Sequence, residues 1–229
     1  DYDKKIFDFL SKDDQQSPMP ANLDINLSKI SDLRYGENPH QRGAVYSDQK
    51  NGVANSKLLH GKPMSYLNYL DADAAYISAN AFPEMCVSII KHTNSCGLSY
   101  HKSQLEAYKL ALRGDPISAF GGIIGLNSEL QTETALEISK TFFEVIIAPS
   151  FSKQALEILT AKKNIRLLRS TFDNQVKEYR TINGGILYQE KDNFELDTSQ
   201  WEIVTKNKPK NEDMENLIFA WKSIKFIKS

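Results

Sequence analysis

The chain has 229 residues, enough to bury a hydrophobic core as one large domain or as a domain with an appendage. Its 28 basic and 29 acidic residues nearly cancel, so no overall field attracts a polyanion, and we expect neither nucleic acid nor an anionic membrane as partner. The apolar share of 41% is ordinary for a globular protein and argues against disorder.

The N-terminal part is predicted to hold a short helix over residues 3–10, because Ile6, Phe7 and Leu10 recur at helical spacing. Residues 17–20 are rich in helix breakers, and we interpret them as a linker. A short helix cut off by a linker suggests the tail of a preceding domain. Residues 33–43 then form a polar, turn-rich stretch.

Helices and short apolar strands alternate over the following hundred or so residues. The alanine-rich segment 71–82 predicts a helix, and the continuous apolar run 85–90 predicts a buried strand. The same patterns predict helices at 103–112, 132–142 and 153–159, and strands at 122–126, 145–148 and 165–168. Because this alternation requires crossover connections, it predicts a layered α/β domain with a largely parallel sheet.

The C-terminal part has a different pattern. Residues 180–188 predict a strand broken by Gly184 and Gly185, residues 201–204 predict another strand, and residues 213–227 predict an amphipathic helix.

The cysteines indicate a compartment. Cys86 and Cys96 show no pairing pattern, and no segment resembles a secretory signal or a membrane span. We therefore expect a cytoplasmic protein without a membrane partner. We also expect no metal site, because structural zinc needs cysteine or histidine pairs at short spacing.

The strongest chemical feature follows the predicted strand that ends at Ile90. Ligands of layered α/β sheets bind beyond the strand ends, and here the chain continues with residues 91–97, KHTNSCG. The ammonium of Lys91 can bind an anionic or carbonyl oxygen while the imidazole of His92 accepts a proton, which suffices for acyl or formyl transfer. From the spacing alone, a solvated Lys91 and a hydrogen-bonded turn at His92 are the simpler interpretation.

Two further segments could bind a ligand. Residues 33–41, LRYGENPHQ, offer the guanidinium of Arg34 to a phosphate and the ring of Tyr35 to a base, although a proline-bearing surface turn explains them equally well. In residues 114–122, GDPISAFGG, paired glycines let the backbone approach a ligand and Phe120 could face an aromatic ring. A tight turn that needs positive φ is the alternative there.

Several common enzyme classes lack their marker residues. The sequence contains no Gly-x-x-x-x-Gly-Lys phosphate loop, no Gly-x-Gly-x-x-Gly, no Gly-x-Ser-x-Gly elbow and no His-Glu-x-x-His. The His-x-Glu and Pro-Cys-x-x-Cys pattern of zinc deaminases is also missing.

Five segments together resemble the family of bifunctional purine enzymes that join AICAR transformylase to IMP cyclohydrolase. They are residues 33–41, 91–97, 114–122, 145–149 and 184–189, and they occur in the family's order across nearly the whole chain. The resemblance implies folate-dependent transfer of a formyl group from 10-formyltetrahydrofolate to the 5-amino group of AICAR, within a cytoplasmic homodimer. It makes the formyl donor a co-substrate and the AICAR nucleotide the second small-molecule partner.

The resemblance also implies an architecture. It predicts a three-layer cytidine-deaminase-like α/β fold with a largely parallel or mixed sheet, present twice in the family's transformylase domain. Residues 1–12 would be the tail of a preceding cyclohydrolase domain, 13–32 a linker, 33–210 the first transformylase subdomain, and 211–229 the helix leading to the second. Because the second copy supplies much of the folate site and a bound monovalent cation, we expect this chain alone to be inactive.

The resemblance assigns roles to individual residues. His92 would take a proton from the 5-amino group of AICAR as that group attacks the formyl carbon, and Lys91 would stabilise the developing oxyanion. Contacts to the nucleotide would come from Arg34, Tyr35, Asn68, Phe120, Gly121 and Glu144. One departure is Ser95, where many relatives carry proline, and it predicts a looser turn that keeps the reacting groups.

A second function belongs to another class: a non-catalytic module that binds a purine nucleotide. Such a module needs the Arg34–Tyr35 turn but no matched pair of lysine and histidine. Because both features are present, the sequence favours catalysis.

Overall fold

The computed structural model describes residues 19, 21–48, 51–174, 177–192 and 196–227. They belong to two compact units, one formed by Leu27–Asp173 with Asn207–Ser229 and the other by Asp1–Asn26 with Asn174–Lys206. The helix predicted over 3–10 lies outside the described residues, as does all of the 17–20 linker except Met19. The domain boundaries expected from the resemblance stay predictions.

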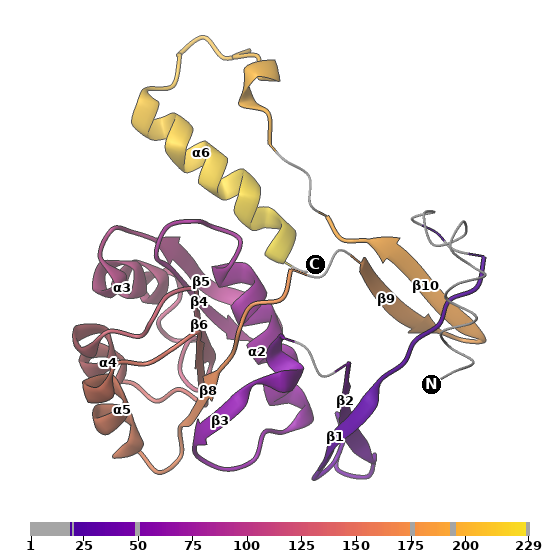
Figure 1. Cartoon of the computed structure of the whole chain (residues 1–229). Helices are drawn as coiled ribbons and strands as arrows, with labels where there is room; N and C mark the ends of the chain where they lie inside the picture. Colours follow the sequence, from indigo (N-terminus) through magenta and orange to yellow (C-terminus); the bar gives the residue numbers. More distant parts are fainter. Residues whose placement is uncertain (1–18, 20, 49–50, 175–176, 193–195, 228–229) are drawn as a thin grey trace. The chain divides into compact units, whose positions relative to one another are not determined.

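The larger unit is built on a six-stranded sheet in the order β3-β8-β7-β6-β4-β5 (Figure 1). Its strands are β3 (Lys57–His60), β4 (Cys86–Lys91), β5 (Asn94–Tyr100), β6 (Ile123–Leu126), β7 (Val145–Ala148) and β8 (Arg166–Arg169). Only β6–β7 and β7–β8 pair in parallel, whereas β3–β8, β4–β5 and β4–β6 are antiparallel. The α/β class and the mixed sheet are confirmed, but the expectation of a largely parallel sheet is wrong.

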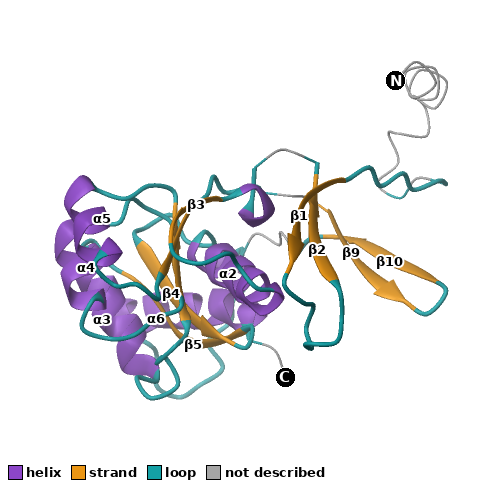
Figure 2. Ribbon diagram, turned by 90° about the horizontal axis from the view of Figure 1, so that it is seen from below, coloured by secondary structure: helices purple, strands orange, loops and turns teal. Residues whose placement is uncertain are grey.

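Helices cover both faces of this sheet, as Figures 1 and 2 show from two directions. One face carries α2 (Tyr66–Ala79), and the other carries α3 (Gln104–Gly114), α4 (Thr132–Ile138) and α5 (Lys153–Thr160). Strand residues alternate between two cores: in β7, Val145 and Ile147 join the cluster with α2, while Ile146 and Ala148 join the opposite cluster. The domain therefore has three layers, and the more specific cytidine-deaminase-like label stays a prediction.

Helix α2 begins earlier than its alanine-rich core indicates. The sequence predicted residues 71–82, but Ser65 caps the helix and starts it at Tyr66. The Ser65 hydroxyl accepts the Asn68 N–H at 3.1 Å, and the Asn68 side chain accepts the Ser65 N–H at 3.2 Å. This reciprocal cap uses asparagine where glutamate or glutamine is usual, so the pattern was missed.

Two antiparallel hairpins differ from the prediction: the first was not predicted, and the second was predicted as one broken strand. β1 (Ser28–Leu33) and β2 (Gly43–Ser47) form an antiparallel hairpin around the turn-rich stretch. In the smaller unit, the strand predicted over 180–188 is a hairpin of β9 (Lys177–Ile182) and β10 (Gly185–Glu190). It reverses next to Gly184, whose φ of +83° suits glycine.

The strand predicted over 201–204 is wrong. These residues follow the short helix η3 (Thr198–Gln200) in irregular backbone, and the Val204 side chain is 85% exposed. The apolar run satisfied the strand pattern, but the described residues offer it no partner strand, and an unpaired strand is not stable. In the larger unit, a short 3-10 helix, η2 (Val53–Asn55), lies before α2.

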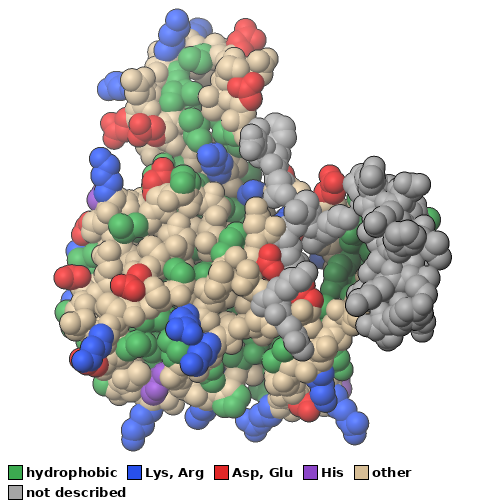
Figure 3. Space-filling model, viewed as in Figure 1, with side chains coloured by type: hydrophobic (Ala, Val, Ile, Leu, Met, Phe, Trp, Pro, Cys, Tyr) green, Lys and Arg blue, Asp and Glu red, His purple; other side chains and the backbone are tan. Residues whose placement is uncertain are grey.

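The C-terminal helix is confirmed as α6 (Asn211–Ser223), which is followed by the 3-10 helix η4 (Ile224–Phe226). Phe219 packs its ring on Phe82 and Tyr100, with centroids 5.1 and 5.3 Å apart. Elsewhere the helix exposes apolar side chains, among them Leu217 and Trp221, and Figure 3 shows hydrophobic side chains in green along α6. No helix among the described residues is both long and apolar enough to cross a bilayer.

Candidate functional site

The ends of β4, β6 and β7 meet at one edge of the sheet. The register pairs Ile90 with Ile123 and Ile123 with Val145. Because β4 runs antiparallel to β6, the residues after Ile90 lie beside those that precede the two parallel strands. The predicted site residues on this edge are Lys91, His92, Phe120, Gly121 and Glu144. We call these five, together with Asn68 of α2, the edge cluster.

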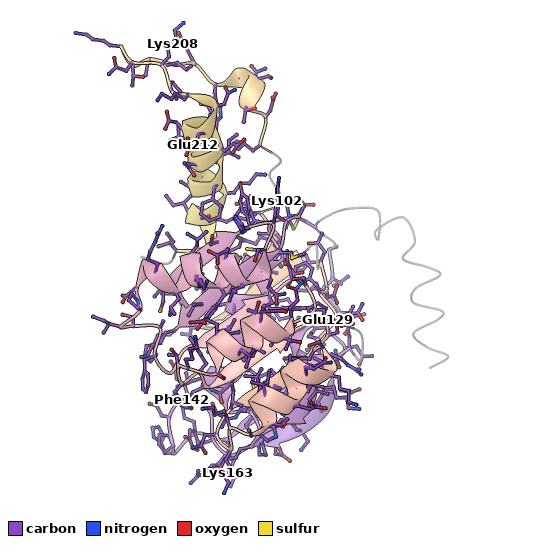
Figure 4. All side chains as sticks on the ribbon, turned by 90° about the vertical axis from the view of Figure 1, so that its left-hand side faces the viewer. Lys102, Glu129, Phe142, Lys163, Lys208 and Glu212 are labelled. Carbon is purple, nitrogen blue, oxygen red and sulfur yellow. The ribbon has the colours of Figure 1, made fainter. Side chains whose placement is uncertain are left out.

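The position of this edge differs from the usual rule for parallel sheets. Ligands commonly bind at the carboxyl ends of parallel strands. Here the cluster follows the carboxyl end of β4 but precedes the amino ends of β6 and β7. In Figure 4, Phe142, which precedes β7, and Glu129, which follows β6, lie at opposite ends of the domain.

Lys91 is held at the edge by the backbone that enters β6. Its Nζ donates to the carbonyl oxygen of Phe120 at 2.9 Å. Since an ammonium has three N–H donors, this bond leaves two for other acceptors. The Phe120 ring is 58% exposed and lies 5.7 Å from the ring of Phe142. Lys91 is therefore fixed beside an exposed aromatic surface.

Gly121 lies in a tight turn with positive φ, which was the alternative interpretation of residues 114–122. Its φ is +74°, and its N–H donates to the Phe142 carbonyl at 2.9 Å. A Cβ on the neighbouring Gly122 would lie 2.9 Å from the carbonyl oxygen of Ile90. The two glycines thus bring the β6 backbone close to the end of β4.

His92 lies in the two-residue turn between β4 and β5. Both turn residues have positive φ, 53° at His92 and 59° at Thr93, which is the geometry of a type I′ hairpin. The Asp71 carboxylate of α2 accepts the His92 N–H at 3.2 Å and the Thr93 N–H at 2.7 Å. The imidazole is exposed, so it can meet a ligand.

Glu144 is the centre of a polar group on the same edge. Its Oε2 accepts a hydrogen bond from Asn68 Nδ2 at 2.8 Å and lies 3.9 Å from Nη1 of Arg166. Arg166 also donates its Nε–H to the carbonyl oxygens of Lys62 and Pro63. The Asn68 residue is buried, whereas the Glu144 side chain is 44% exposed. The carboxylate therefore has room to accept a further hydrogen bond.

Asn68 stabilises the fold as well as this edge. We expect Asn68→Ala to lower the free energy of unfolding of the chain by about 2 kcal/mol, because it removes half of the α2 cap and a bond to a carboxylate. Urea unfolding followed by circular dichroism measures the change. Ser103→Ala is the matched control, since the Ser103 hydroxyl caps α3 through a long 3.4 Å bond from the Glu106 N–H, and it should cost less. Equal unfolding midpoints for Asn68→Ala and the wild-type chain would contradict the expectation.

Arg34 and Tyr35 lie in the connection between β1 and β2. The turn is ordered by Gln41, whose carbonyl accepts the Gly36 N–H at 2.7 Å and whose side chain accepts the Asn38 N–H at 2.8 Å. Arg34 is exposed, and its Cζ lies 5.7 Å from the Tyr35 ring centroid. Over the described ranges, no hydrogen bond, ion pair or ring contact joins Arg34 or Tyr35 to the edge cluster.

Cys96, which belongs to the same segment as Lys91 and His92, is not an activated nucleophile. Burial raises the pKa of its thiol, and Asp115 raises it further. Burial also raises the pKa of the Cys86 thiol to about 12. Because the thiolate is the reactive form, burial makes both thiols poor nucleophiles.

Ser95 lies in β5, which is the last strand of the sheet. Proline is tolerated on edge strands, so the proline that the resemblance leads us to expect at this position is compatible with the fold.

Sequence reasoning missed two charged residues of this edge, Asp71 and Arg166. Asp71 lies three residues after Asn68, so the two share one face of α2 once the helix is known to start at Tyr66. Arg166 is the first residue of β8, which has two arginines around two leucines, and it pairs with Val145 at the same edge. Where the chain is described, no group of three or more His, Cys, Asp or Glu residues could hold a metal ion.

Comparison with known proteins finds relatives that match the whole chain. The family described as the AICARFT/IMPCHase bienzyme matches residues 1–229. The chain is 42% identical to the bifunctional purine biosynthesis protein PurH of Listeria monocytogenes serotype 4a (strain HCC23), covering 100% of the chain and 46% of that protein. It is 41% identical to the protein of the same name from Thermoanaerobacter sp. (strain X514), covering 100% of the chain and 45% of that protein. The chain thus spans about half the length of the curated relatives it matches.

Proposed function

Since the chain belongs to the AICARFT/IMPCHase bienzyme family, we propose that it is the first half of a folate-dependent formyltransferase domain that acts on AICAR in purine biosynthesis. In this proposal it is part of a longer, cytosolic, bifunctional protein that also carries IMP cyclohydrolase. The observation that carries the proposal is the shared edge of Lys91 and His92 beside the Asn68–Glu144 pair.

The chemistry assigned to the edge is general base catalysis with charge stabilisation. His92 takes a proton from the 5-amino group of AICAR as the amine nitrogen attacks the formyl carbon of 10-formyltetrahydrofolate. Lys91 uses its remaining N–H donors to stabilise the oxyanion that develops on the formyl oxygen. When this intermediate collapses, the bond between the formyl carbon and N10 of the folate breaks, and His92 passes the proton to N10 as tetrahydrofolate leaves. The bond from Lys91 to the Phe120 carbonyl supports the role of Lys91, because it holds the ammonium in place before the substrate arrives.

The proposal also assigns residues that contact the nucleotide. Glu144 accepts hydrogen bonds from hydroxyl or N–H donors of AICAR, and Asn68 holds its carboxylate in position. Phe120 and Gly121 line the nucleotide at the start of β6. Arg34 and Tyr35 contact the nucleotide from the β1–β2 turn, where a guanidinium suits a phosphate and a phenol suits a base.

The proposal is tested by assaying formyl transfer from 10-formyltetrahydrofolate to AICAR. We expect turnover by the longer protein, and none by this chain alone, because the second half, a homodimer partner and a monovalent cation complete the site in the proposal. Turnover by the chain alone would contradict the proposal that its active site is incomplete. AICAR binding by a longer protein that transfers no formyl group would instead favour the non-catalytic nucleotide-binding module.

A further inference from the structure

The turn that carries His92 has an unusual backbone. His92 and Thr93 both have positive φ, and no other non-glycine residue described in the structure does. Type I′ turns favour asparagine and glycine, and positive φ is especially unfavourable for a β-branched residue such as threonine. The sequence therefore places a β-branched residue, Thr93, at one of the two positions where the hairpin reverses, and strain of this kind persists only where the surroundings enforce it.

The surroundings that enforce it come from α2. The Asp71 carboxylate accepts the Thr93 N–H with Oδ1 at 2.7 Å and the His92 N–H with Oδ2 at 3.2 Å. Each carboxylate oxygen thus binds one of the two strained peptide groups. Hydrogen bonds to an ionised acceptor are roughly twice as strong as neutral ones. The same helix holds Glu144 through Asn68, one helical turn before Asp71, so one rigid element sets both parts of the edge.

We propose that Asp71 is a positioning residue for the formyl transfer: its carboxylate clamps the His92–Thr93 turn and thereby fixes the backbone from which the imidazole extends. The inference rests on the proposed function of His92 as the base. It assigns Asp71 no contact with either substrate. A catalytic base must be held within hydrogen-bond reach of the proton it accepts, and small displacements of reacting groups lower rates strongly.

The first test measures the turn itself in the chain. Asp71→Ala should accelerate amide hydrogen exchange at His92 and Thr93 by roughly 10-fold or more, because both N–H groups lose a charged acceptor. Asp71→Asn keeps the size of the side chain but only one accepting oxygen, so its effect should be smaller. The matched control is Asp197→Ala, which removes a carboxylate that accepts the Ser199 N–H at 2.9 Å in the other unit, and it should leave exchange at His92 and Thr93 unchanged.

The second test measures catalysis in the longer protein. Asp71→Ala should lower kcat for formyl transfer by about 100-fold, with the KM for AICAR changed little, because the nucleotide contacts remain. Asp197→Ala should leave kcat unchanged. Thr93→Gly should restore part of the kcat lost in Asp71→Ala, since glycine adopts positive φ without strain. A merely structural role of Asp71 would predict neither the kcat effect at constant KM nor this rescue.

The outcomes separate the positioning role from the proposed function. If the wild-type longer protein transfers no formyl group, the proposed function fails while the exchange experiment still tests the clamp. If the wild type is active and Asp71→Ala retains its kcat, the positioning role is overturned. Unchanged exchange at His92 and Thr93 in Asp71→Ala would also overturn it.

Discussion

His92→Ala should lower kcat for formyl transfer by the longer protein by about 10²-fold to 10⁴-fold, the usual contribution of a general base. The variant removes the only imidazole of the edge cluster. The hydrogen bonds from Asn68 to Glu144 and from Lys91 to the Phe120 carbonyl remain. AICAR binding should therefore stay close to that of the wild type. Steady-state kinetics and calorimetric titration with AICAR measure the two effects separately.

His101→Ala is the matched control for the loss of a histidine. His101 follows β5 at the end opposite to the turn, about 20 Å from His92 along a strand of this length. Its Nδ1 accepts the Ser103 N–H at 3.0 Å ahead of α3. We expect this variant to retain the kcat of the wild type. Equal turnover of His92→Ala and His101→Ala would remove His92 from the chemistry.

Gly97→Ala should destabilise the chain by about 3 kcal/mol or more, since overpacking against backbone cannot be relieved by moving a side chain. A Cβ at Gly97 would lie 1.8 Å from the carbonyl oxygen of Ala111 in α3 and 2.6 Å from its carbonyl carbon. Gly97, the last residue of the segment 91–97, is therefore needed for close packing of β5 on α3. Urea unfolding of the chain measures the loss.

Gly185→Ala is the control for adding a methyl group to a strand glycine. Gly185 is the first residue of β10, and a Cβ there would have no atom within 4 Å. We expect its unfolding midpoint to match that of the wild type. A Gly97→Ala chain as stable as Gly185→Ala would mean that β5 and α3 do not pack as closely as described.

The buried strands were predictable because burial on both faces leaves a plain signal. The apolar run 85–90 became β4, and 145–148 became β7 with the predicted bounds. β5 was missed because it is an edge strand of mixed composition, NSCGLSY, and because its turn, His92–Thr93, carries no Asn-Gly signal. Missing this hairpin also hid the antiparallel pairing of β4, so the sheet was expected to be largely parallel.

The sequence predicted which residues belong to the candidate site better than it predicted how they are arranged in space. The strand-end rule pointed to Lys91 and His92 after Ile90, and the resemblance supplied Glu144 and the roles of all three residues. The roles of these residues in catalysis stay predictions. Asp71 could not be found from the sequence, because its function depends on two backbone N–H groups brought beside α2 by a turn with no sequence signal. Contacts between side chains and distant backbone groups follow from tertiary packing, not from local pattern.

The proposed function requires that Lys91 and His92 face the amine of a nucleotide bound at the edge of the sheet. A crystal structure of the longer protein with AICAR bound tests it most directly. We predict that the 5-amino nitrogen lies about 2.6–3.2 Å from an imidazole nitrogen of His92, the reach of a general base, with the Lys91 ammonium on the same side of the ligand. A nucleotide bound away from the edge cluster, or a His92 imidazole turned away from that amine, would contradict the account.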